Sequence, residues 1–384
     1  MSDTYNFCAG PAMLPTEVMK KAQQEFIDWH GTGSSVMELS HRSSEFVAVA
    51  KQAEADIRDL LEIPDDYSVL FCHGGGRGQF SAVPLNLLPQ GKSADYIVSG
   101  SWSKAAAKEA FNFGEINIVD IVNKNDGISS IIPTKDWPLN SDAAYVHYCP
   151  NETVDGIEIN DIPETNGVPL VADMSSTILS HKIDISKFAL IYAGAQKNIG
   201  PSGLTLAIVR DDLLSFADQK TPSTLNWKIQ SENNSMINTP TTFSIYMAGL
   251  VFEWLLKLGG LKKMEEITTN DYLITKDGSF KKVNEIIINE KNEEIYNIKV
   301  QHGFDDLKCT GIHDILSIKI KKHDGFKRPL DRLKRGVYKT KFIKAEELTE
   351  DHLVGFPIPT YEKDIKDFTE DNARMYGIIL GDGS

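Results

Sequence analysis

The sequence is poor in cysteine, and its four cysteines, Cys8, Cys72, Cys149 and Cys309, lie far apart along the chain. They form no short-range pair of the kind that binds zinc and no framework for disulfides, which predicts a reducing compartment. No apolar run is long enough for a membrane-spanning helix and no signal peptide opens the chain, so we expect a cytoplasmic protein without membrane contact. Basic residues are also few: 40 Lys and Arg stand against 54 Asp and Glu, a formal net charge of −14. This balance argues against nucleic-acid binding by the chain as a whole, though not by every segment.

The 384 residues are otherwise ordinary in composition, with 41% hydrophobic and 24% charged residues. Such a chain can bury a large core, and its length predicts two or three domains. Its charge is unevenly spread, because the stretch from Lys319 to Lys344 holds eleven Lys and Arg against two Asp. This change in the density of basic residues indicates a domain boundary near Met264–Thr268.

Short apolar runs that end in polar residues alternate with helical patterns over the first two thirds of the chain. The runs that predict buried strands are Ser68–Cys72, Tyr96–Val98, Ala143–Tyr148, Val168–Ala172 and Phe188–Ile191. Helices are expected from Pro15 onward, with Val18, Ala22, Phe26 and Trp29 at helical spacing, and at Glu45–Leu61 and Phe243–Leu258. Alternating strands and helices predict an α/β fold with a parallel sheet, whose site lies at the carboxyl ends of the strands.

Two of these strand ends carry an acid and a lysine. Asp173 directly follows one apolar run, and Lys197 follows another, among glycine and alanine. Burial disfavours the ammonium form, so such a lysine can be partly neutral and nucleophilic near pH 7, as a Schiff base requires. An isolated lysine on a turn is more often a surface residue, but the pair suits pyridoxal phosphate. The acid would keep the pyridine nitrogen protonated and the amine would bind the aldehyde.

A third and a fourth strand end suit other parts of the same cofactor. His73-Gly74-Gly75-Gly76-Arg77 follows a strand, and its glycines can aim backbone N–H groups at a phosphate. Trp102 follows another strand and could stack on a flat ring, although it could equally be a core aromatic. Each signal is weak alone, because any tight strand-to-helix turn can use glycine.

Longer motifs carry a family resemblance. They are Phe7–Pro11 with Met37–Arg42, Phe71–Phe80, His147–Thr153 and Ala193–Pro201, in this order. Residues 1–267 resemble the phosphoserine aminotransferase family, within class V of the fold-type I pyridoxal-phosphate enzymes. The resemblance implies the large α/β domain of that fold, with a mostly parallel sheet flanked by helices.

The resemblance also implies roles for individual residues. Lys197 would bind the cofactor aldehyde and act as general base and acid, and Asp173 would contact the pyridine nitrogen. The other implied cofactor contacts are Gly76, Arg77, Trp102, Thr153 and Gln196, with Asn238 and Thr239 reaching the neighbouring subunit of a homodimer. The implied substrate contacts are Ala9, His41 and Arg42; alone, His41 and Arg42 would read as solvated charges.

The reaction implied by the resemblance is amino transfer from glutamate to 3-phosphohydroxypyruvate, giving O-phosphoserine and 2-oxoglutarate, a step of serine and also of pyridoxine biosynthesis. Two alternatives stay open at this point. One is another class V aminotransferase with a different acceptor. The other is an inactive host for the segment that follows residue 267.

That following segment has a pattern of its own. Asn270–Val283 alternates around Asp277-Gly278, which predicts a hairpin, and strands are expected at Glu294–Val300 and Ile315–Ile320. Thr310 and His313 form a Thr-x-x-His before an apolar run, which resembles the first half of an intein; a satisfied core histidine is the plain alternative. We therefore expect a partial, mainly β intein-like (Hint) domain over 268–360.

Residues 361–384 resemble the start of a LAGLIDADG homing endonuclease, in which Asp382 would bind a divalent metal. A completed domain of this kind would bind DNA, and the basic run Lys319–Lys344 would suit DNA phosphates, although it could be a solvated face. Glu265–Asp271 holds neither Cys nor Ser for a first splice residue. The small C-terminal domain of the aminotransferase family has no counterpart here. From these features we expect an interrupted reading frame and no contribution of residues 268–384 to transamination.

Overall fold

A computed structural model describes most of the first two thirds of the chain and separate strands of the remainder. The residues described are 8–125, 128–261, 269, 272–274, 280–282, 295–298, 307–310, 314–319, 341–349 and 352–354. The chain divides into two compact units, Met1–Glu265 and Glu266–Ser384. In the described part, no helix is both long and apolar enough to cross a membrane.

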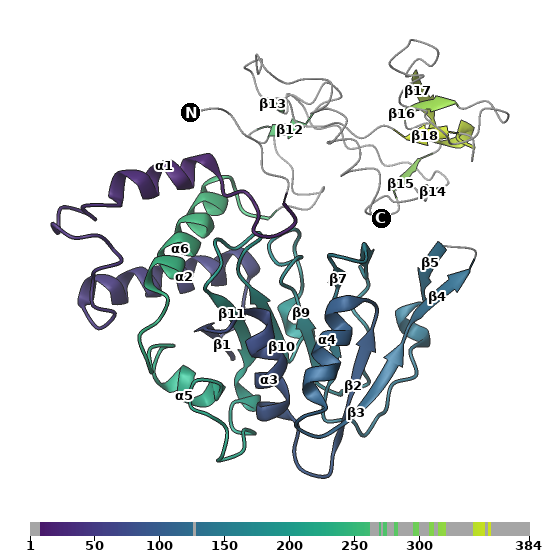
Figure 1. Cartoon of the computed structure of the whole chain (residues 1–384). Coiled ribbons are helices and arrows are strands. Elements are labelled where there is room, and N and C mark those ends of the chain that lie inside the picture. The colour runs from purple at the N-terminus through teal and green to yellow at the C-terminus, as the bar shows by residue number, and fades with distance from the viewer. Residues whose placement is uncertain are drawn as a thin grey trace. The chain divides into compact units, whose positions relative to one another are not determined.

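The first unit contains all the described α-helices and a seven-stranded sheet (Figure 1). The helices are α1 (Thr16–Glu25), α2 (Ser44–Leu61), α3 (Gly75–Leu87), α4 (Ser101–Ala110), α5 (Trp227–Glu232) and α6 (Thr242–Lys257). The strands of the sheet are β1 (Tyr67–Cys72), β2 (Ser93–Val98), β3 (Glu115–Asp120), β6 (Val146–Tyr148), β9 (Leu170–Asp173), β10 (Leu190–Gly194) and β11 (Thr205–Arg210). Two small hairpins join β4 (Val122–Asn125) to β5 (Ile128–Ile131) and β7 (Asn151–Glu152) to β8 (Ile157–Glu158).

The seven strands lie in the order β1-β11-β10-β9-β6-β2-β3. All neighbours from β10 to β3 pair in parallel, whereas β11 is antiparallel to both β1 and β10. Cys72 at the end of β1 and Gly194 at the end of β10 both pair with Thr205, so these two strands end at the same edge of the sheet. The predicted mostly parallel α/β sheet is confirmed, and the carboxyl ends of six of its strands share one edge.

Alternate residues of the central strands face two different helical layers. Leu190 and Tyr192 pack with residues of α3 and α4 in one hydrophobic cluster. Ile191 and Ala193 pack with residues of α2 and α6 in the other. Because successive strand residues point to opposite faces, an apolar run without polar alternation requires cover on both sides. The sheet is therefore the middle of three layers, as Figure 1 shows.

Helix α2 has a side-chain cap at its N-terminus and a left-handed residue at its C-terminus. Ser43 Oγ accepts a hydrogen bond from the Phe46 N–H at 3.3 Å, and Glu62 closes the helix in the left-handed region at φ 52°. Helix α1 is shorter than its spacing predicts and ends at Glu25.

The prediction that Phe26 and Trp29 continue α1 is wrong. The chain turns back after Phe26, with His30, Gly31 and Gly33 at φ 52°, 76° and 73°, and the Trp29 N–H bonds to the Ser34 carbonyl at 2.9 Å. Residues in the left-handed region cannot continue a right-handed helix. Phe26 consequently stays 47% exposed.

Strand β10 and helix α3 approach so closely that Gly194 has no room for a side chain. A Cβ atom on Gly194 would lie 2.7 Å from the Gly76 backbone nitrogen. We expect Gly194→Ala to lower the free energy of unfolding by about 1–3 kcal/mol, because two backbone segments must move apart. Gly76→Ala is the matched control for stability, since its Cβ would meet the Ser175 hydroxyl at an ordinary 3.5 Å. Denaturant titration of both variants measures the difference, and equal stabilities would contradict the close approach.

Among its described residues the second unit contains short strands and one short 3-10 helix, Ala345–Glu347. The strands are β12 (Tyr272–Ile274), β13 (Phe280–Lys282), β14 (Ile295–Ile298), β15 (Leu307–Thr310), β16 (Asp314–Lys319), β17 (Lys341–Lys344) and β18 (His352–Val354). Strands β12 and β13 form an antiparallel pair, and β16 pairs with β17 and β18. The predicted turn at Asp277-Gly278 lies outside the described residues. Strands β14 and β16 lie where strands were expected. His313 and Asp382 lie outside the described residues.

Candidate active site

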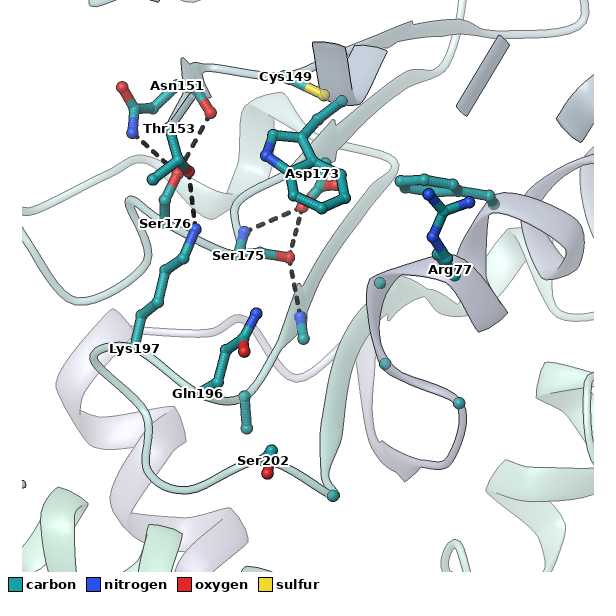
Figure 2. A pocket seen from close by; sticks show the side chains of 18 residues that line it. Arg77, Cys149, Asn151, Thr153, Asp173, Ser175, Ser176, Gln196, Lys197 and Ser202 are labelled. Carbon is teal, nitrogen blue, oxygen red and sulfur yellow. Dashed lines mark hydrogen bonds between the residues drawn. The ribbon is translucent and has the colours of Figure 1, made fainter. Parts of the chain in front are cut away.

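A cavity of about 320 Å³ opens at the carboxyl ends of the parallel strands, within the size range of small-ligand sites (Figure 2). It gathers seven of the residues that the sequence predicts to bind a cofactor: Gly76, Arg77, Trp102, Thr153, Asp173, Gln196 and Lys197. They come from five segments between residues 76 and 197, which the sheet brings to one edge.

Lys197 lies just after β10, where the strand gives way to a turn. Gln196 has a φ of 154°, and its carbonyl accepts the Ala12 N–H at 2.7 Å. The Lys197 Nζ donates a hydrogen bond to Thr153 Oγ1 at 2.7 Å, and Figure 2 shows the side chain extending toward Thr153. Burial lowers the pKa of Lys197, and the nearby Asp173 carboxylate partly opposes this shift. The amine is therefore neutral at a lower pH than that of an ordinary lysine.

Asp173 ends β9 and is 8% exposed. Its Oδ1 accepts hydrogen bonds from the Ser175 N–H at 3.0 Å and the Ser175 hydroxyl at 2.6 Å. The same hydroxyl accepts the Gly194 N–H at 2.9 Å, which fixes Asp173 relative to β10. Burial raises the pKa of Asp173, while Ser175 and Lys197 lower it. A carboxylate held in this way favours a cationic group beside it.

The start of α3 and the side chain of Arg77 form an anion site. Gly74 and Gly75 adopt left-handed conformations, at φ 89° and 63°, and no side chain caps the first turn of the helix. The backbone N–H groups of this turn lack helical partners, and the positive end of the helix dipole favours a negative ligand. Among the described residues, the Arg77 guanidinium has no hydrogen bond or ion pair, and it lies at the cavity wall.

Trp102 lies in the first turn of α4 and lines the cavity. Its indole Nε1 is buried without a hydrogen-bond partner in the described part of the chain. Its ring offers a flat apolar surface on which a planar heteroaromatic group can stack.

These groups fit pyridoxal phosphate in the chemistry of their donors and acceptors. One cavity is lined by four groups: a positively charged anion-binding site, a flat aromatic ring, a buried carboxylate and an amine with a lowered pKa. They match the phosphate, the ring, the ring nitrogen and the aldehyde of that cofactor.

Five predicted residues do not line this cavity. Ala9 precedes Gly10, whose Cβ position lies 3.4 Å from Lys197 Cε, so the loop that carries Ala9 packs beside the lysine. Asn238 and Thr239 are exposed, and Arg42 is exposed with no described partner for its guanidinium. His41 is half-buried, and its Nε2 is buried without a described partner. Their predicted substrate and subunit contacts stay predictions.

Sequence reasoning missed several residues of the cavity wall. They are Phe80, Cys149, Asn151, Ser175, Ser176, Ala195, Ser202 and Gly203. Ser175 left a signal in the sequence, because a serine two positions after an aspartate commonly closes a turn onto that aspartate. The half-buried Asn151 left none, since its hydrogen bond to Ser176 at 2.9 Å joins two segments 25 residues apart.

The lowered pKa of Lys197 predicts how the amine titrates. In the cofactor-free protein, acetylation of Lys197 by acetic anhydride should reach half its maximal rate at a lower pH than acetylation of free Nα-acetyl-lysine, because burial disfavours the charged amine. In Asp173→Asn the midpoint should fall further, since the carboxylate that favours the ammonium form is gone. Peptide mass spectrometry at each pH measures both midpoints. A Lys197 midpoint equal to that of free Nα-acetyl-lysine would contradict the inferred effect of burial.

Comparisons with known proteins agree with this site. The class-V aminotransferase family matches residues 4–316. Phosphoserine aminotransferase from Bacillus circulans subsp. alkalophilus is 43% identical, with 67% of this chain and 71% of that chain covered and a TM-score of 0.64. A phosphoserine aminotransferase with bound PLP from Trichomonas vaginalis is 40% identical, with 67% and 76% covered and a TM-score of 0.63.

An aspartate aminotransferase of Thermus thermophilus, at 17% identity and a TM-score of 0.51 over 65% of this chain and 70% of that chain, shares the fold. The family match, the structural likeness and the chemistry of the cavity all agree. The chain belongs to the class-V aminotransferases and is a pyridoxal-phosphate-dependent transaminase.

Proposed function

We propose that the chain transfers the amino group of glutamate to 3-phosphohydroxypyruvate, giving O-phosphoserine and 2-oxoglutarate, in serine and also pyridoxine biosynthesis. The observation that carries this proposal is the 40–43% identity to phosphoserine aminotransferases over about two thirds of the chain. The family match over residues 4–316 includes all the segments that line the cavity. Aminotransferase structures that are 13–17% identical to the chain share its fold.

Each residue of the cavity has its own role in this reaction. When bound, the cofactor supplies an electron sink for the carbanion at the substrate's α-carbon. Lys197 Nζ would hold the cofactor through its aldehyde. As a free amine it would take the substrate's α-proton as general base and deliver it, as general acid, to the cofactor carbon of that aldehyde. Its lowered pKa suits this task, because a neutral amine is available closer to neutral pH.

Asp173 holds a proton on the ring nitrogen by its negative charge, and Ser175 keeps the carboxylate in place. Arg77 and the start of α3 would bind the cofactor phosphate, Trp102 would stack on the ring, and Thr153 and Gln196 would complete the site. We place Asn238 and Thr239 at the phosphate of a neighbouring subunit in a homodimer, which their exposure permits.

The substrate's anionic groups need cations of their own. We assign Arg42 and His41 to this role, with Ala9 in the loop beside Lys197. The exposed guanidinium of Arg42 has no partner among the described residues, so it is available to a carboxylate or a phosphate. A planar guanidinium can bind either group through two hydrogen bonds.

The test is a half-reaction of the cofactor-loaded, full-length chain with amino acids. O-phosphoserine and glutamate should convert the absorbance of the bound cofactor at least about tenfold faster than alanine or glycine, because a fixed cation selects the second anionic group. The reverse half-reaction compares 3-phosphohydroxypyruvate with pyruvate and glyoxylate. Faster conversion by alanine or glycine, or by pyruvate or glyoxylate, would assign the chain to another class V reaction.

We infer an intein-like element in residues 268–384, and in a completed endonuclease domain a metal at Asp382 and a DNA partner. The Thr310–His313 pattern supports the inference, together with the short antiparallel strands around it. An element of this kind predicts hydroxylamine-induced scission of the full chain near Thr268–Thr269 that His313→Ala abolishes. Mass spectrometry of the intact protein detects the fragment, and an uncleaved wild-type chain removes the self-processing interpretation.

A further inference from the structure

Glu152 is a fully buried acid, at 0% exposure, that the transaminase chemistry described above does not use. It lies in β7, one residue before Thr153. A buried carboxylate is costly unless hydrogen bonds compensate its charge. The partners of Glu152 therefore indicate what the charge is for.

Those partners are the first N–H groups of α4. Glu152 Oε2 accepts the Trp102 N–H at 2.8 Å, and Oε1 accepts the Ser103 N–H at 2.7 Å. Both N–H groups lie in the first turn, where no carbonyl of the helix can accept them. The residue before the helix is Gly100, which has no side chain to cap it. Glu152, 50 positions away in the sequence, thus caps the helix that carries Trp102.

A second carboxylate completes this arrangement. Asp155 Oδ2 accepts the Ser101 N–H at 2.7 Å, so three successive N–H groups of α4 bind one short segment. A Cβ atom on Gly100 would lie 2.6 Å from Asp155 Oδ2 and 2.7 Å from Glu152 Cγ. The carboxylates can reach the helix only because this position is glycine.

The same short segment also contacts two other walls of the cavity. Thr153 accepts the hydrogen bond of the Lys197 amine at 2.7 Å. Asn151 Nδ2 donates to Ser176 Oγ at 2.9 Å, in the turn that follows Asp173. A shift of Glu152 would therefore change where Trp102 lies relative to Lys197 and to the turn after Asp173.

We propose that Glu152 is a positioning residue that fixes the Trp102 ring against the cofactor through the first turn of α4. The proposal rests on the proposed stacking role of Trp102. Glu152 itself touches neither cofactor nor substrate in this reading. Its carboxylate lies at the positive end of the α4 dipole, where a negative side chain is favoured.

The experiment compares Glu152→Gln, Trp102→Ala and the double variant in the full-length chain, with pyridoxal phosphate as the probe. Glu152→Gln keeps the shape but presents an amide group to a backbone N–H. We expect it to raise the Kd of pyridoxal phosphate roughly 10- to 100-fold, the scale of losing a hydrogen bond to a charged group. It should also change the visible circular dichroism of the bound cofactor, which reports the setting of the ring.

The double variant separates positioning from a general structural role. If Glu152 acts through Trp102, Glu152→Gln should change the Kd less than about twofold once Trp102 is alanine. Glu109→Gln is the matched control. Glu109 is a carboxylate within α4 itself that accepts a hydrogen bond from the Ser81 hydroxyl at 2.9 Å, and its replacement should leave Kd and dichroism unchanged.

Gly100→Ala covers the case in which Glu152→Gln does not fold. It displaces both carboxylates while keeping every charge, and it should reproduce the loss of affinity and the altered dichroism. Two results would overturn the proposal. One is a double variant whose Kd rises by the full product of the two single factors, and the other is an unchanged Kd and dichroism in Glu152→Gln. An unchanged Kd in Trp102→Ala overturns the stacking role and this proposal together, whereas the reaction proposed above is tested separately by the amino-acid half-reactions.

Discussion

Replacing Lys197 by alanine should abolish covalent attachment of pyridoxal phosphate and reduce transamination by at least about 10²–10⁴-fold, the share that a general acid–base group alone contributes. The amine is the one primary amine at the cavity wall, among the residues described, and so the group that can form a carbon–nitrogen double bond with an aldehyde. Its hydrogen bond to Thr153 and its place after β10 hold it at the site. Arg77 and the start of α3 remain, so Lys197→Ala should still bind the cofactor reversibly through its phosphate.

Borohydride reduction followed by peptide mapping measures this attachment directly. Wild-type protein should carry the reduced cofactor on the peptide that contains Lys197, and Lys197→Ala should carry none. Lys187→Ala, an exposed lysine in the turn that leads to β10, is the matched control and should label like wild type. A reducible adduct at the same site in Lys197→Ala would falsify the assignment of Lys197.

The sequence was sufficient to predict the central strands and the acid and lysine at their ends. Val168–Ala172 and Phe188–Ile191 are continuous apolar runs because β9 and β10 are covered on both faces, so their burial is visible residue by residue. Asp173 and Lys197 interrupt this pattern at the point where each strand ends. A local signal could therefore reveal a site that is assembled from distant segments.

The order of the strands could not be obtained in the same way. Strand β11 (Thr205–Arg210) inserts between β1 and β10 and runs against both, yet nothing in its local sequence distinguishes it from a parallel strand. Pairing between strands more than 100 residues apart depends on the whole chain. The early end of α1 had a local cause, the turn at Gly31 and Gly33, which the helical spacing of Phe26 and Trp29 concealed.

The role of Glu152 shows a further limit of sequence reasoning. The motif around Thr153 contains Glu152, but an isolated glutamate is most often a solvated surface residue. Only the fold reveals that its carboxylate is buried against the start of α4, 50 positions earlier. Capping of a helix by a distant side chain leaves no spacing rule in the sequence, in contrast to Ser43, which caps α2 from the adjacent position.

Asp173→Asn should slow transamination by about 10²–10³-fold, the typical cost of losing one preorganised electrostatic contact, while the affinity for cofactor falls far less. A neutral amide cannot hold a proton on the ring nitrogen, so the developing carbanion loses its sink. The contacts of Ser175 to this position place the amide where the carboxylate was. The loss should therefore appear in the rate of the half-reaction and only weakly in the Kd.

Asp173→Asn should lower the rate but raise the free energy of unfolding of the cofactor-free protein. Burial raises the pKa of Asp173 in the folded chain, so the stability that its protonated form gives at low pH is lost as the pH rises through that value. Above this pKa the wild-type chain keeps a buried charge that asparagine lacks. We expect Asp173→Asn to unfold at a higher denaturant concentration than wild type at pH 7, and the difference to shrink toward acid pH.

Asp184→Asn is the matched control for both measurements. Asp184 accepts the Ser186 N–H at 3.1 Å and the Ser186 hydroxyl at 2.6 Å, the same local turn that Asp173 forms with Ser175, but it is exposed. Its replacement removes an equivalent turn contact without touching the cavity, so rate and cofactor affinity should stay at the wild-type values. Because both aspartates make the same turn contact with a serine, a large loss of rate that only Asp173→Asn shows would come from the position of Asp173 at the cavity and not from the loss of that contact. Near-normal turnover of Asp173→Asn with cofactor bound would refute the electrostatic role of this carboxylate.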